Sequence, residues 1–104
     1  MPELPAAEAE SRVSVEVTCN RSGDGWACDV EVAHSGQTTQ HRVAVHAADL
    51  EGLDPRTTDP TELVRRSFDF LLEREPPGSI LRKFDLVAIG RYFPEYESTI
   101  RRFR

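Results

Sequence analysis

The sequence lacks any apolar run approaching the ~20 residues that a membrane-spanning helix needs. Its first ten residues are acidic and contain Pro2 and Pro5, with neither the basic start nor the apolar centre of a secretory signal. We therefore expect a cytoplasmic protein without a membrane partner. The two cysteines, nine positions apart, form no CxxC motif, and no second pair accompanies them, so a zinc site is not expected.

The chain also lacks the motifs that mark common catalytic and cofactor sites. It contains no GxSxG elbow and no glycine-rich phosphate loop. His34, His41 and His46 lie within thirteen positions, but strand periodicity spreads them over different faces without metal-site spacing. Paired acids such as Glu16 and Glu31 would lie on an exposed sheet face with no cleft. The sequence therefore identifies no catalytic residue, and we predict neither a cofactor-binding nor a metal-ligating residue. A small hydrolase or metal-binding protein is the third functional hypothesis.

Charge is present in quantity but is unevenly distributed. The formal net charge of the 104 residues is −5. Residues 1–64 hold twelve acids and four arginines, whereas residues 65–104 hold six acids and nine basic residues. The first part should repel nucleic acids and anionic membranes, and the second should attract them weakly. The length allows one domain, which we place at residues 12–104 after a disordered leader, residues 1–11, of Glu, Ala and Pro.

The clearest pattern in the sequence is the alternation of β-strands. Apolar and polar residues alternate over residues 13–19 and again over residues 26–32. A two-residue loop at Gly23-Asp24 would pair apolar residues throughout: Cys19 with Cys28, Val17 with Val30, and Val15 with Val32. A second turn at Ser35-Gly36 would add a third antiparallel strand, whose inward residues are Thr39, His41, Val43 and Val45. The apolar face of this three-stranded meander must be covered.

Helices in the second half of the chain provide the cover. Residues 47–53 are interpreted as a short helical turn or loop. Asp59 can cap a helix that has Pro60 at its first position and that runs to Glu75, where two prolines end it. Its apolar stripe consists of Val64, Phe68, Leu71 and Leu72. Ser79, Asp85 and Pro94 can each open a further short helix, and the apolar residues of these helices are Ile80, Leu81, Phe84, Leu86, Ile89, Phe93, Tyr96, Ile100 and Phe103. The predicted fold class is α+β: a three-stranded antiparallel β-meander followed by a covering α-helix and two or three short C-terminal helices.

The segment from Ser67 to Glu97, SFDFLLEREPPGSILRKFDLVAIGRYFPEYE, resembles a family of small bacterial proteins. In that family a short β-rich part precedes a helical block with FLLEREP, SIL, F-x-L and YFPEY elements. The resemblance implies a bacterial domain of unknown function. It implies no activity and no site residues.

Cys19 and Cys28 would lie directly opposite each other in the proposed register. They would form a non-hydrogen-bonded pair with Cα atoms ~4.5 Å apart, which permits a disulfide. The favoured interpretation is nevertheless a pair of reduced thiols that act as small core residues in a reducing cytoplasm. A cross-strand disulfide is the alternative.

The leading functional hypothesis is a non-catalytic protein-interaction or assembly module without a cofactor. Residues 13–20 and 38–46 would both be open strand edges, and such edges invite pairing with another chain or with a second copy. A homodimer through an edge strand or the C-terminal helix is one form of this hypothesis.

The alternative hypothesis is a nucleic-acid-binding accessory protein. It would use basic residues of the C-terminal helices, namely Arg82, Lys83, Arg91, Arg101 and Arg102. Aromatic residues interleave with them and could stack on bases, although their spacing is that of core residues.

Overall fold

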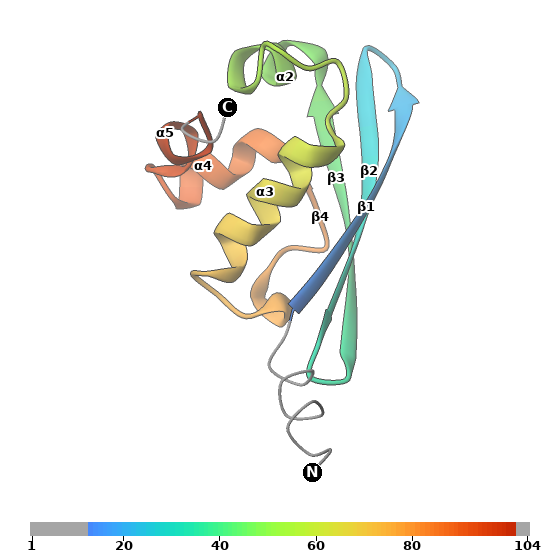
Figure 1. Ribbon diagram of the computed structural model, residues 1–104, viewed down its shortest axis with the longest axis vertical. Helices are drawn as coiled ribbons and strands as arrows, with labels where there is room; N and C mark the ends of the chain where they lie inside the picture. The colour runs from blue at the N-terminus through green and yellow to red at the C-terminus, as the bar shows by residue number, and fades with distance from the viewer. Residues whose placement is uncertain (1–12, 102–104) are drawn as a thin grey trace.

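A four-stranded sheet with helices on one face forms the protein (Figure 1). The computed structural model describes residues 13–101. The strands lie in the order β1 (Val13–Ser22), β2 (Gly25–His34), β3 (Gln37–His46) and β4 (Lys83–Asp85). The first three are antiparallel to their neighbours, and β4 runs parallel to β3. The α+β class and the meander are thus confirmed, but the purely antiparallel three-stranded sheet is wrong because a fourth strand makes the sheet mixed.

The register of the meander is the one that the alternation predicts. Val15 lies opposite Val32, and Cys28 lies between Cys19 on β1 and Val43 on β3. Gly23 has a positive φ of 61° at the first loop, and Ser35 and Gly36 have φ values of 52° and 78° at the second. These left-handed conformations give the turns the twist that two-residue hairpins require.

The segment that precedes β4 differs from the prediction. The sequence pattern predicts a helix over residues 80–84, yet Arg82 accepts a hydrogen bond from the backbone N–H of Arg42 at 2.7 Å through its carbonyl oxygen. Residues 83–85 pair with the edge of β3 and therefore form strand β4 instead of a helix. Lys83 and Asp85 are exposed while Phe84 is half-buried, which is the period-two pattern of an edge strand.

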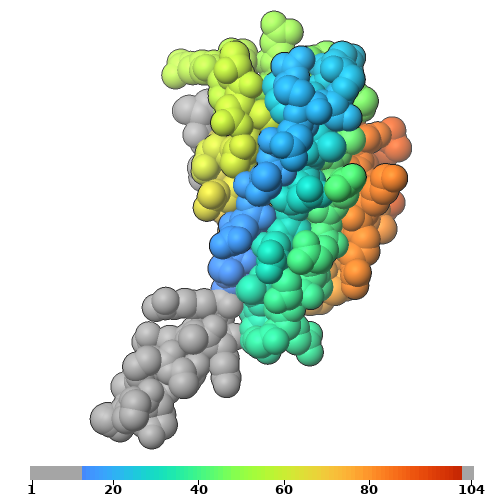
Figure 2. Space-filling model, turned by 90° about the vertical axis from the view of Figure 1, so that its right-hand side faces the viewer, coloured from blue at the N-terminus to red at the C-terminus, as the bar shows by residue number. Residues whose placement is uncertain are grey.

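The helices pack on the inner face of the sheet, and no residue between 13 and 101 covers the outer face (Figures 1 and 2). They are α2 (Ala47–Leu53), α3 (Thr61–Leu72), α4 (Ile89–Tyr92) and α5 (Tyr96–Arg101), with 3₁₀ turns at Pro77–Ser79 and Leu86–Ala88. Helix α3 begins at Thr61 with Pro60 as its N-cap, one residue later than predicted, and Asp59 precedes the cap. The Oδ1 of Asp59 accepts hydrogen bonds from the backbone N–H and the hydroxyl of Thr61 at 2.9 and 2.7 Å. The helix itself ends at Leu72, three residues before the predicted Glu75.

The core lies between α3 and the inner face of the sheet. Phe68 is fully buried there, with its ring centroid 5.3 Å from that of His41 and 6.1 Å from that of Phe84. The other fully buried apolar residues include Val30, Val32, Val43, Val45, Leu63, Val64, Leu86 and Ile100. The helical cover that the sequence predicts over the apolar face of the sheet is therefore present. The predicted leader, residues 1–11, and Arg102 lie outside the described residues.

Candidate functional site

Strand β1 leaves the longest open edge of the sheet among residues 13–101. It has ten residues and pairs with β2 alone. On the opposite side, β4 pairs with residues 42–44 of β3. The prediction of two open edges is therefore confirmed for β1 and wrong for the central part of β3.

Alternate residues of β1 direct their backbone groups away from β2. The two-residue loop makes Ser22 and Gly25 the closing hydrogen-bonded pair, and bonded and non-bonded pairs alternate from there. The Cα atoms of Cys19 and Cys28 are 4.0 Å apart, which fits the closer, non-bonded class. The residues whose N–H and C=O groups point outward are therefore the odd-numbered ones: Val13, Val15, Val17, Cys19 and Arg21.

Helix α3 forms a wall beside this edge. A groove of about 490 Å³ lies between the first residues of β1 and the helix, and its lining is Val13, Ser14, Val15, Glu16, Arg65 and Asp69. Figure 2 shows β1 in blue at the border of the sheet, with α3 in yellow beside it. Partial burial raises the pKa of Asp69, and the Arg65 guanidinium opposes that shift. The groove thus combines an unpaired backbone edge, the exposed Val13, the half-buried Val15 and three charged side chains, of which Glu16 and Asp69 are acidic and Arg65 is basic. Sequence reasoning missed its α3 wall.

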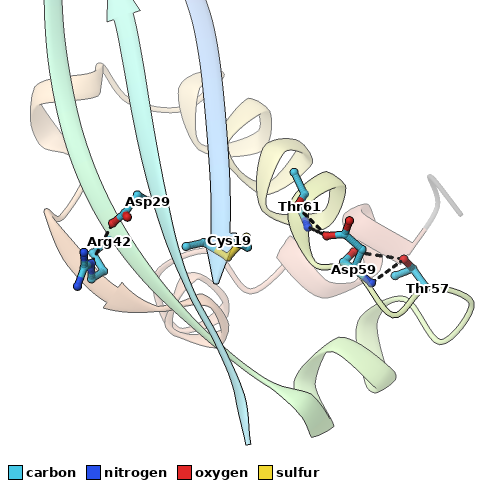
Figure 3. The surroundings of a disulfide bond; sticks show 7 residues. Cys19, Asp29, Arg42, Thr57, Asp59 and Thr61 are labelled. Atoms are coloured by element: carbon cyan, nitrogen blue, oxygen red, sulfur yellow. Dashed lines mark hydrogen bonds and ion pairs between the residues drawn. A yellow bond between two sulfur atoms is a disulfide. The ribbon is translucent and has the colours of Figure 1, made fainter. Parts of the chain in front are cut away.

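A disulfide joins the middle of β1 to β2. The sulfurs of Cys19 and Cys28 are 2.04 Å apart, and Figure 3 shows the bond together with the Asp29–Arg42 ion pair on the next strands. The favoured interpretation of two reduced thiols is therefore wrong, and the alternative is correct. The register places Cys19 directly opposite Cys28 in any cellular compartment. This proximity proved a better guide than the expectation of a reducing cytoplasm.

Reduction of this disulfide should destabilise the protein. The bond closes a loop with a sequence separation of 9, so we expect reduction to lower the free energy of unfolding by about 2–3 kcal/mol. Thiol titration of the native protein should detect no reactive thiol before reductant is added. A Cys19→Ala/Cys28→Ala variant is the control, since its unfolding should not respond to reductant. Two thiols that titrate in the untreated protein would contradict the prediction.

His41 is a core residue, as its position in the alternation predicts, and it links β3 to the segment before β4. Its Nδ1 donates to the carbonyl oxygen of Leu81 at 2.8 Å, and its Nε2 lies 2.9 Å from the hydroxyl of Thr39, an arrangement that suits the neutral ring. Burial lowers the pKa of His41 below its ordinary value of 6.5. His46 is exposed, also as predicted.

Stability should consequently fall in mild acid. The unfolded chain takes up a proton on His41 near pH 6.5, whereas the folded chain resists protonation to lower pH. The stabilising contribution is therefore fully present above that pH and is lost as the pH falls towards the lowered pKa. Thermal unfolding from about pH 7.5 to about pH 5.5 should show a smaller loss for His41→Gln than for the wild type or for His46→Gln. Equal losses in all three would show that His41 is not responsible.

The basic residues of the nucleic-acid hypothesis come from separate elements. Arg82 precedes β4, Lys83 begins it, Arg91 lies in α4, and Arg101 ends α5 with its Nη2 4.0 Å from Glu97. Among the interleaved aromatic residues that the structure describes, only Tyr92 is exposed, at 68%, and the others pack in or against the core. The hypothesis stays a prediction that a gel-shift assay at low salt would test, since phosphate contacts are strongest there.

An apolar cavity of about 190 Å³ lies beside the C-terminal end of α3, with the exposed Leu81 and Tyr92 in its lining. Sequence reasoning missed this cavity, because it is formed by residues of α3, β4 and α4 together. Within residues 13–101, no group of three or more histidine, cysteine or acidic side chains lies close enough to hold a metal ion. No helix of that same part of the chain is long and apolar enough to cross a membrane.

No protein-family model, curated protein or solved structure matches the chain. The resemblance of residues 67–97 to small bacterial proteins therefore stays a prediction. The function has to be inferred from the geometry of the β1 edge and its groove.

Proposed function

We propose that the chain is a protein-interaction module that binds its partner by adding a strand to β1. An added strand would bond to the outward backbone groups of β1, and the groove beside α3 would receive its side chains. In this mode of recognition, main-chain hydrogen bonds provide affinity and the side-chain groove provides selectivity.

The observation that carries the proposal is the contrast between the two edges of the sheet. Proteins usually protect an edge with proline, lysine, a bulge or a very short strand. β1 contains neither proline nor lysine, and its pairing with β2 runs without a bulge from Val13 to Ser22. The opposite edge, in contrast, ends in the three-residue β4, which begins with Lys83. A ten-residue edge that lacks proline, lysine and a bulge is suited to pairing with another chain, and α3 lies beside it as one wall of the groove.

Replacing Val17 with proline tests strand addition to β1 without disturbing the folded sheet. The N–H of Val17 points outward, so Val17→Pro removes a donor from the open edge and leaves the β1–β2 ladder intact, a position where proline is tolerated. Thr18→Pro is the matched control, because the N–H of Thr18 points towards Asp29 on β2 and its loss should destabilise the fold.

The experiment selects peptides from a displayed random library against the wild-type chain. We expect the selected peptides to slow hydrogen exchange at the odd-numbered amides of β1 and to lose binding to folded Val17→Pro. Peptides that bind Val17→Pro equally well, or that protect amides elsewhere on the molecule, would overturn the proposal.

A further inference from the structure

We propose that the partner at β1 is a second copy of this chain, paired antiparallel about a two-fold axis that passes beside Val17. The inference rests on the proposed strand addition and goes further by naming the partner and the register. A two-fold axis makes such an interface self-complementary, so each chain presents the same residues to the other.

The outward backbone groups restrict the register. They belong to odd-numbered residues, and hydrogen-bonded pairs must join odd with odd across the axis. Setting Val17 opposite the partner's Val17 pairs Val15 with the partner's Cys19, and Val13 with the partner's Arg21. This register pairs every outward-facing residue of β1. If the register shifts by one hydrogen-bonded pair in either direction, either Arg21 or Val13 of each chain loses its pairing partner in the other chain's β1.

The side chains on the outer face favour the same register. Glu16 then lies opposite the partner's Thr18, and Ser14 lies opposite the partner's Asn20, so no like charges meet. The register that sets Val17 opposite the partner's Cys19 also avoids like charges and is disfavoured only by the lost pairing at Val13. The other neighbouring register, with Val15 opposite the partner's Val17, would set Glu16 against the partner's Glu16. Because Glu31 already lies opposite Glu16 on β2, that alternative would gather four carboxylates, and like charges on facing strands are destabilising.

The groove beside α3 supplies the charge complementarity. Residues 18–21 of the partner strand would occupy it, since they lie opposite Val13–Glu16. The side chains of odd-numbered residues face the helices, so the partner's Arg21 would extend along the wall that carries Asp69. Within one chain the Arg21 guanidinium lies 5.0 Å from the Trp26 ring centroid, so this cation is already on the helix-facing side of the sheet. A guanidinium from the partner would meet the exposed Asp69 carboxylate there.

Charge pairs placed on the outer face test both the partner and the register. Ser14 and Asn20 lie opposite Ala33 and Ala27 on β2, so substitutions there should leave the fold stable. Ser14→Lys/Asn20→Glu creates two symmetric ion pairs in the proposed register and should tighten dimerisation about fivefold. Ser14→Glu/Asn20→Glu creates two like-charge pairs and should weaken it by a similar factor. Dimerisation is measured by sedimentation velocity, with thermal unfolding of each variant as the check on folding.

Ser14→Lys/Thr18→Glu is the register control. This variant creates ion pairs only in the register that sets Glu16 against the partner's Glu16. In the proposed register it sets the new carboxylate at position 18 against the partner's Glu16, so it should weaken the dimer. Tightening by this variant would overturn the register. A wild-type chain that stays monomeric at millimolar concentration, or a dimer whose affinity ignores both charge pairs at 14 and 20, would overturn the inference. If the chain does not dimerise but still binds partners by strand addition, library peptides should still slow hydrogen exchange at the odd-numbered amides of β1. That result would overturn the dimer inference and leave the proposed function standing.

Discussion

Replacing Phe68 with alanine is expected to lower the free energy of unfolding by about 3–5 kcal/mol. The side chain is fully buried, and its ring contacts those of His41 and Phe84. Phe68 therefore joins α3 to both β3 and β4, and its removal leaves a cavity where three elements meet. Urea unfolding of the variant and the wild type, followed by circular dichroism, measures the difference.

Tyr92→Ala is the matched control for this substitution. It removes an aromatic ring of similar size, but Tyr92 is 68% exposed. Its loss should therefore change the free energy of unfolding by no more than about 0.5 kcal/mol. If the two variants were equally stable, Phe68 would not be the centre of the core.

Removal of Asp54 should have the second large effect, a loss of about 3 kcal/mol in the free energy of unfolding. Its Oδ2 lies 2.9 Å from Nη2 of Arg66, and the two side chains are only 14% and 15% exposed. The Nε and Nη1 atoms of Arg66 are also buried and have no hydrogen-bond partner among the described residues. Asp54→Ala would thus leave a buried cation without its counter-charge. Chemical denaturation of the variant measures the loss.

The double variant Asp54→Leu/Arg66→Met separates this electrostatic effect from a loss of packing. It removes both charges and fills the site with apolar groups, an exchange that is often neutral or stabilising. We expect the double variant to be more stable than Asp54→Ala. If the double variant lost as much stability as the single one, the packing of the pair would matter rather than its charge.

The sequence allows the meander to be predicted in detail because one buried face specifies its register. A slip of one residue would turn Val15 and Val32 towards solvent, and the turns at Gly23 and Gly36 fix the loop lengths. Strand β4 could not be predicted in the same way. A three-residue strand has too little periodicity to distinguish it from a short helix, and its pairing depends on the unpaired backbone of β3, which no local pattern records.

The candidate site was predictable only in part. The open edge of β1 follows from the alternation, and so does the proximity of Cys19 and Cys28. Their oxidation was predicted wrongly because the inference started from the compartment rather than from the geometry. The groove was not predictable, since Arg65 and Asp69 have the pattern of solvated residues on the polar side of a helix. Their role depends on where α3 lies against β1, and sequence periodicity does not give that position.

The parallel pairing of β4 with β3 also determines how far an assembly of these chains can grow. A sheet with two free sides can recruit neighbour after neighbour, and such growth ends in filaments. Among residues 13–101, β4 occupies the central backbone groups of β3 and presents only three residues of its own. In the dimer that we propose, pairing through β1 would occupy the longer open edge of each chain. Such an arrangement would favour a closed pair over a polymer.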